Sequence, residues 1–249
     1  MRLLKFSLIV FGAVLFLLST TQAMAAVPLQ VNVDQVLNSQ SFSSSINLLL
    51  AISAISLIPF FLMSTTSFLR IIIVLGMIRS AIGTQQVPPA PVIVSLAMFM
   101  TLYIMSPVWQ DVYTQAIEPY NKGRISQQVA LEKGLVPIRK FMLRQTREKD
   151  LALFVEQARI KAPTRIEEVP TYVLIPAFLI SELKTAFQIS FVIFIPFVII
   201  DLVVSNILLS LGMFMLSPVL VSLPFKILLF VLTDGWFVIT RGLMQSFHY

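Results

Sequence analysis

The chain contains no cysteine, and its only histidine, His248, is the penultimate residue. The absence of cysteine excludes disulfides, thiol nucleophiles and cysteine-ligated metals. A lone terminal histidine is typical of a solvated residue, and the sequence has no phosphate-binding glycine loop. We therefore expect a protein that is not an enzyme, with no catalytic residue, no metal site and no cofactor.

Charged residues are also scarce. They make up 12% of the 249 residues, whereas 57% are hydrophobic and the mean hydropathy is +0.89. Soluble domains carry about a quarter charged residues, so this composition predicts an all-α integral membrane protein. The net charge is +6, but basic residues alternate with acidic ones and no aromatic–basic platform occurs. We expect contact with anionic membrane lipid and no nucleic acid.

Residues 1–25 have the pattern of a cleavable signal peptide. Arg2 and Lys5 make a basic start, Phe6–Leu18 is an apolar core, and Ala23-Met24-Ala25 supplies small residues for cleavage. An uncleaved first membrane helix is the alternative, although the apolar core is short for one. Cleavage would place the new amino terminus outside the cytoplasmic membrane. Residues 26–45 are polar and serine-rich and indicate a loose lead-in.

Residues 46–110 are interpreted as a first hydrophobic hairpin. Ile46–Met63 would cross inward and Val92–Trp109 would cross back out, which places Arg70 and Arg79 on the cytoplasmic side. Nine residues of helix put these two arginines on nearly opposite sides. The helix that carries them is therefore not surrounded by lipid on every side.

Residues 111–170 have a different character, with 11 basic and 8 acidic side chains in helical patterns. We expect a small helical periplasmic domain, because a segment of this length can be translocated in spite of its positive charge. Thr146 is a candidate amino-terminal cap for a helix that continues through Leu151. Pro137 is a candidate first residue of a short helix.

Residues 171–249 are interpreted as a second hydrophobic hairpin with a central gating loop. Within it, residues 186–232 hold only two charges in 47 residues, which is too long for one span and about right for two. Gly212 and Pro218 predict that one helix ends and the next begins between them. Kinked or broken helices are expected because the hairpin contains four prolines, Pro176, Pro196, Pro218 and Pro224.

Five ionisable residues interrupt this apolar region, and they carry both signs: Glu182, Lys184, Asp201, Lys226 and Asp234. A charge inside a membrane must pair or face water. Mixed signs allow salt bridges that hold helix against helix or subunit against subunit, so we favour buried charge pairing. The alternative interpretation is an ion or proton relay.

Met213-Phe214-Met215 lies between Gly212 and Pro218. Methionine is flexible and repacks around varied partners. A ring of such loops from several copies could close a pore to ions and still yield to a passing chain. Core packing is the alternative, but it requires no break in a helix. We therefore regard these three residues as a candidate gate or gasket.

Several blocks of the sequence are long and specific. They are Met63–Val108, Pro176–Phe187 (PAFLISELKTAF), Phe194–Pro218, Leu223–Trp236 (LPFKILLFVLTDGW) and Gln245-Ser246-Phe247. These blocks resemble the FliP family of type III secretion export gates. The likeness covers most of residues 59–249, whereas residues 111–170 match only in character.

The resemblance implies a core structural subunit of the flagellar protein-export gate. Such a subunit is a multi-pass protein of the bacterial inner (cytoplasmic) membrane at the flagellar basal body. The resemblance also implies that the chain folds into kinked helical hairpins. About five copies of the chain would assemble with FliR and FliQ into a helical channel for unfolded flagellar substrates. FlhB and FlhA are the implied neighbouring export proteins. The methionine gasket of the family corresponds to Met213, Phe214 and Met215, although the family commonly has methionine where this chain has Phe214.

Two other functions are compatible with the residues. One is the homologous subunit of a virulence injectisome, against which the signal peptide and the Gln245-Ser246-Phe247 ending weigh. The other is an ion-coupled secondary transporter that uses Glu182 and Asp201 as its relay.

Overall fold

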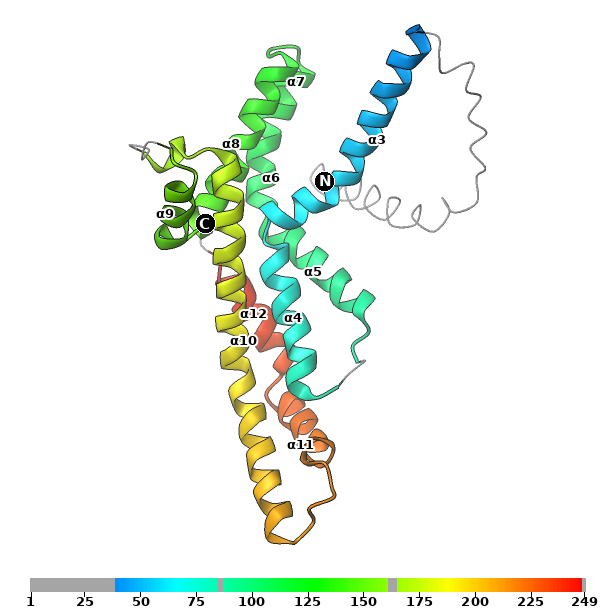
Figure 1. Cartoon of the computed structure of the whole chain (residues 1–249), viewed down its shortest axis with the longest axis vertical. Helices are drawn as coiled ribbons and strands as arrows, with labels where there is room; N and C mark the ends of the chain where they lie inside the picture. Colours follow the sequence, from blue (N-terminus) through cyan, green and yellow to red (C-terminus); the bar gives the residue numbers. More distant parts are fainter. Residues whose placement is uncertain (1–38, 85–86, 161–164, 248–249) are drawn as a thin grey trace. The chain divides into compact units, whose positions relative to one another are not determined.

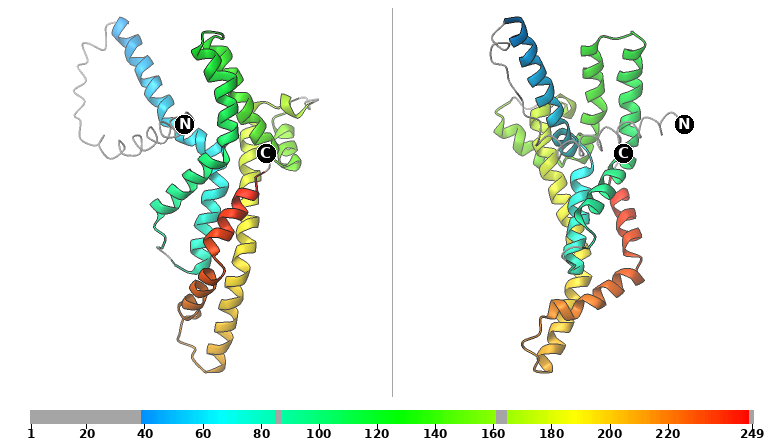
Figure 2. Two further views of the ribbon diagram at one scale, coloured as in Figure 1. Left: turned by 180° about the vertical axis from the view of Figure 1, so that it is seen from behind. Right: turned by 90° about the vertical axis from the view of Figure 1, so that its right-hand side faces the viewer.

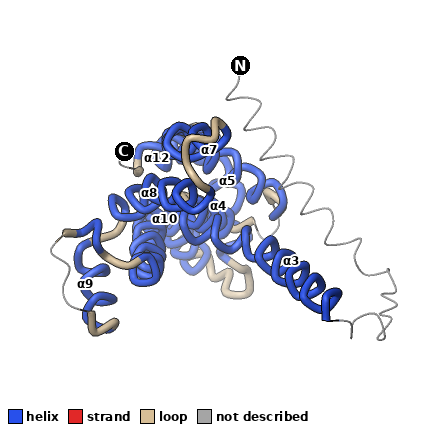
Figure 3. Tube along the Cα trace, turned by 90° about the horizontal axis from the view of Figure 1, so that it is seen from above, coloured by secondary structure: helices blue, strands red, loops and turns tan. Residues whose placement is uncertain are grey.

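The computed structural model describes residues 39–84, 87–160 and 165–247. These residues contain helices and loops and no strand (Figure 3). The predicted signal peptide, most of the predicted lead-in and His248 lie outside the described residues. The chain divides into two units, residues 1–59 and 60–249, and each is considered by itself. The described part of the first unit is the amino-terminal part of one helix, α3 (Ser39–Thr65), which continues through Pro59.

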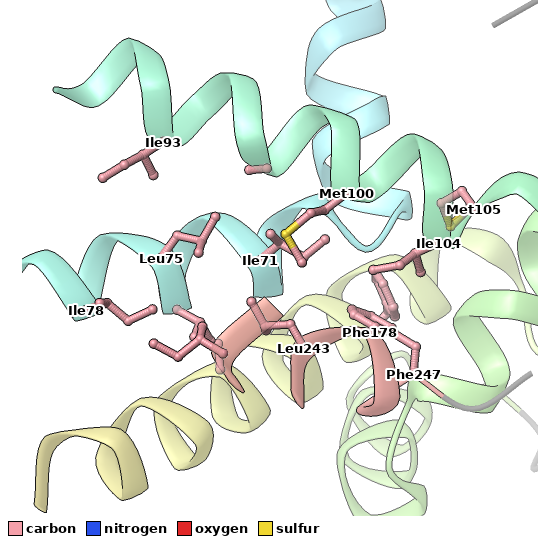
Figure 4. Close-up of a cluster of buried hydrophobic side chains, with 14 of the residues drawn as sticks. Ile71, Leu75, Ile78, Ile93, Met100, Ile104, Met105, Phe178, Leu243 and Phe247 are labelled. Carbon is pink, nitrogen blue, oxygen red and sulfur yellow. The ribbon is translucent and has the colours of Figure 1, made fainter. Parts of the chain in front are cut away.

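The second unit is built around two helices, α4 (Phe68–Ile82) and α10 (Thr171–Ser210), which pack against each other (Figure 1). One face of α4 is apolar and buried, as its helical spacing requires. Side chains from α5 (Ala90–Ile104) and α12 (Gly235–Gln245) join it in one core (Figure 4). Fully buried members of this core include Ile71, Val74, Leu75, Ala97, Leu174 and Phe178.

A helical arm follows α5. It consists of α6 (Ser106–Val112), a π-helical turn η2 (Tyr113–Ile117) and α7 (Glu118–Asn121), and α8 (Gln127–Gln145) packs back along it (Figure 2). The bend between α5 and the helix that begins at Ser106 is 56°.

Two sequence expectations for this region are wrong. Pro137 does not open a helix but is buried within α8, whose amino-terminal cap is Ser126. Thr146 is not an amino-terminal cap but follows the end of α8, and its hydroxyl donates to the Met142 carbonyl at 2.7 Å. The next helix, α9 (Glu148–Gln157), is preceded by Arg147, and a 3-10 turn, η3 (Ile166–Glu168), leads to α10.

The helix α10 runs for 40 residues, with Pro176 and Pro196 inside it. Pro224 likewise lies within α11 (Pro218–Leu232). Of the two expected outcomes, a break does not occur at these three prolines, and a kink stays a prediction. Each proline removes one backbone donor, and the packing of the remaining turns outweighs that loss. Pro218 does begin a helix, as expected. α11 packs on α10, and α12 follows α11 at a bend of 63° (Figure 2).

By length and composition, α10 is the one described helix that could cross a membrane unaided. Up to four crossings are possible if each of three bent helix pairs counts as a single span. The described residues therefore form an all-α protein with at least one apolar helix of membrane-spanning length.

Candidate functional site: buried ion pairs and an apolar loop

Arg70 on α4 and Glu182 on α10 form a bidentate ion pair inside the core. The Arg70 Nε donates to Glu182 Oε2 at 2.8 Å, and its Nη2 donates to Oε1 at 2.5 Å. Arg70 is 2% exposed and Glu182 is fully buried. A planar guanidinium matches a carboxylate in this fork geometry, which makes the pair strong and strict in its orientation.

The same guanidinium binds the ends of two other helices. Its Nη1 donates to the Ser246 carbonyl after α12 at 2.7 Å, and its Nη2 donates to Gln145 Oε1 at the end of α8 at 3.2 Å. The Phe247 ring lies 3.9 Å from the guanidinium carbon, within cation–π range. Arg70 therefore connects α4, α8, α10 and the carboxyl-terminal end of α12.

The corner between α8 and α9 is attached to α10 one residue before Glu182. Ser181 Oγ donates to Asp150 Oδ2 at 2.7 Å and accepts from the Arg147 backbone N–H at 3.1 Å. The Arg147 guanidinium donates to Thr185 Oγ1 at 3.1 Å and to Gln188 Oε1 at 2.5 Å. These hydrogen bonds attach the end of α8 and the start of α9 to α10.

A second ion pair joins α10 to α11. The Lys226 ammonium donates to Asp201 Oδ2 at 2.6 Å, and Ser222 Oγ donates to Asp201 Oδ1 at 2.5 Å. Lys226 is buried, whereas 31% of the Asp201 side chain is exposed. Gly83, with φ +88°, ends α4 so close to α11 that a Cβ there would lie 3.9 Å from Lys226 Nζ.

Glu182, Asp201 and Lys226 are thus in ion pairs within the chain, but the other two candidates for buried pairing are not buried. Lys184 and Asp234 are exposed on the single chain, and neither forms an ion pair with a described residue. Lys184 lies two residues from Glu182 and therefore on the opposite face of α10, and the pairing of Lys184 and Asp234 with a neighbouring subunit stays a prediction. Arg79 is half-buried and, unlike Arg70, forms no salt bridge with a described residue.

The loop between α10 and α11 presents its apolar side chains outward. Phe214 is 76% exposed and Met215 is completely exposed, and Met213 is partly covered. Gly212, with φ +73°, closes α10: its N–H bonds to the Leu209 carbonyl and the Met213 N–H bonds to the Leu208 carbonyl. This is the Schellman arrangement, in which glycine is favoured because the backbone is left-handed.

Sequence reasoning missed the neutral partners of these charges, namely Gln145, Ser181, Ser222 and Ser246. Their amides and hydroxyls carry no charge, so nothing in the local pattern distinguishes them from other polar residues. No group of three His, Asp or Glu residues suited to a metal ion occurs in the described parts of the chain.

The helices, the buried ion pairs and the exposed apolar loop define an all-α protein with at least one helix long and apolar enough to cross a membrane. Comparison with known proteins shows the family to which it belongs. The FliP family model matches residues 51–243, so the chain belongs to the FliP family.

Three curated relatives illustrate the similarity, and each is named flagellar biosynthetic protein FliP. The relative from Pectobacterium carotovorum is 51% identical over 84% of this chain and 81% of its own length. That from Bacillus subtilis is 46% identical over 87% and 98%, and that from Aquifex aeolicus is 44% identical over 82% and 86%.

Proposed function

We propose that this chain is a channel-forming subunit of the flagellar type III export gate. Membership of the FliP family makes it a component of the flagellar export apparatus, with a structural role. Several copies, about five, surround a channel in the inner membrane together with FliR and FliQ, with FlhB and FlhA as neighbours. Unfolded flagellar subunits pass outward through this channel, and residues 111–170 form its periplasmic domain.

The observation that carries the proposal is the exposed apolar loop at the end of a 40-residue helix. A fully exposed Met215 beside a 76% exposed Phe214 has no function in packing the single chain. Exposed apolar patches mark surfaces that other chains cover. When copies of the loop meet around an axis, their flexible side chains form an apolar constriction that excludes ions.

The ion pairs of Glu182 and Asp201 distinguish the proposal from a secondary transporter. The transporter hypothesis needs Glu182 and Asp201 to exchange ions, but each is paired with a cation. They also lie 19 residues apart on one continuous helix, which is about 28 Å along its axis. A separation of this size, with both groups paired, favours a structural role for the two carboxylates.

The test measures ion leakage across the inner membrane of cells that carry the triple variant M213A/F214A/M215A. The narrower alanine side chains should leave the assembled constriction open to ions, while the yield of the assembled particle is unchanged. The matched control is Leu220→Ala, which shortens another exposed apolar side chain, 72% exposed, on α11 outside the loop. An ion-tight membrane with the triple variant would contradict the gasket.

A further inference from the structure

One stripe of α10 faces away from the protein core and carries a lysine at its amino-terminal end. Lys184, Phe187, Phe191 and Val198 recur at intervals of three, four and seven residues and therefore lie on one side of the helix. The opposite side carries Phe178, Glu182 and Ala186, which are fully buried.

This stripe lines an elongated groove, and Met77 of α4 forms its other wall. The groove is open along its length, and the space along it is about 920 Å³. From Lys184 to Val198 the groove follows 14 residues of helix, or about 21 Å. One leaflet of a bilayer, from headgroup to midplane, is about 20–22 Å thick.

Positive charge is concentrated at one end of the groove. The Lys184 ammonium is exposed there and forms no ion pair with any described residue. Gln188, a lining residue, accepts a hydrogen bond from the Arg147 guanidinium and keeps its amide N–H groups as donors. No lining residue is acidic, and the nearest carboxylate in the sequence, Glu182, is bound to Arg70 on the other face.

We propose that this groove binds one anionic phospholipid. The phosphate lies against Lys184 and Gln188, with Arg147 behind them, and an acyl chain lies along Phe187, Phe191 and Val198. A purely apolar partner would leave the lysine charge without a counterion, whereas an anionic headgroup with an apolar tail satisfies both ends. The site does not involve the gating loop, so its existence is independent of the gasket.

The first test is native mass spectrometry of the detergent-purified full-length protein with added phosphatidylglycerol or phosphatidylcholine. We expect phosphatidylglycerol to be retained preferentially and Lys184→Gln to lower its retention about fivefold, which is the effect of one lysine at a lipid surface. Lys140→Gln, an exposed lysine on α8, is the matched control and should bind as the wild type does. Equal retention of the two lipids, or unchanged retention by Lys184→Gln, overturns the proposal.

The second test identifies the occupant directly. A photoreactive benzoylphenylalanine replaces Phe191, which is 69% exposed in the groove, so the change does not disturb the core. Illumination in phosphatidylglycerol vesicles should add the mass of one phospholipid to the protein. Crosslinking to another protein chain instead would assign the groove to a subunit interface and overturn the lipid site.

Discussion

Arg70 and Glu182 are 112 positions apart in the sequence, yet they form the most buried ion pair in the described structure. Because Arg70 also binds the ends of α8 and α12, the pair fixes the mutual positions of four helices. Buried pairs contribute orientation more reliably than stability, since the cost of desolvation offsets much of their attraction.

Removal of Glu182 should therefore lower the unfolding free energy by far more than the ion pair contributes to it. Glu182→Ala leaves the Arg70 guanidinium buried with an unpaired charge, and we expect a loss of about 3–5 kcal/mol in unfolding free energy. Thermal unfolding of the detergent-purified protein would measure it. The control is Lys184→Ala on the exposed face two residues away, which should change stability by less than about 0.5 kcal/mol.

A double variant tests whether the charge itself causes this loss. In R70L/E182L neither charge of the pair remains buried. The loss of unfolding free energy in the double variant should therefore be smaller than the sum of the losses in the two single variants. Strict additivity of the two losses would contradict a direct interaction between these side chains.

The second ion pair should respond unequally to removal of its two partners. Lys226 is buried, so Asp201→Asn leaves an unpaired buried cation, at a cost of about 3 kcal/mol or more. Lys226→Met leaves a carboxylate that water can reach, and it should cost about 1 kcal/mol. The yield of assembled particles from detergent extracts should therefore be lower for Asp201→Asn than for Lys226→Met, and the ion conductance of the membrane should be unchanged in both. A larger loss for Lys226→Met would be inconsistent with the observed exposures.

Phe214 allows a graded test of the gasket. Phe214→Met gives the loop three consecutive methionines and keeps a large flexible side chain, so the membrane should remain ion-tight. Phe214→Ala should leak, but less than the triple alanine variant, because Met213 and Met215 still fill part of the constriction. Ion flux measured in the same strains would reveal this order, and equal leakage from Phe214→Met and Phe214→Ala would contradict it.

The break at Gly212 and Pro218 could be predicted from the sequence because its determinants are local: a left-handed backbone position and a missing donor. Pro137 and Pro196 could not be assigned in the same way. Whether a helix continues through a proline depends on packing of the turns on both sides, and that packing comes from distant segments. Similarly, the spacing of Arg70 and Arg79 excludes a helix surrounded by lipid, but it contains no information on which arginine meets Glu182.

Gly235, at the bend between α11 and α12, provides the sharpest test of local packing. A Cβ added there would lie 2.4 Å from two ring carbons of Phe230, far inside van der Waals contact. Phe230 is held in turn by the Trp236 ring at 5.3 Å and the Phe197 ring at 6.5 Å between centroids. We expect Gly235→Ala to lower the unfolding free energy by about 1–3 kcal/mol, the usual cost of overpacking.

The same helix supplies the control for this substitution. Gly242 has no atom within 4 Å of an added Cβ, so Gly242→Ala should be neutral or slightly stabilising because alanine favours the helix. A smaller residue at position 230 should relieve the clash, which means that Gly235→Ala should cost less in a Phe230→Leu background than in the wild type. Thermal unfolding of the four proteins of this cycle would measure the coupling, and a coupling of zero would show that Phe230 does not limit the side chain at position 235.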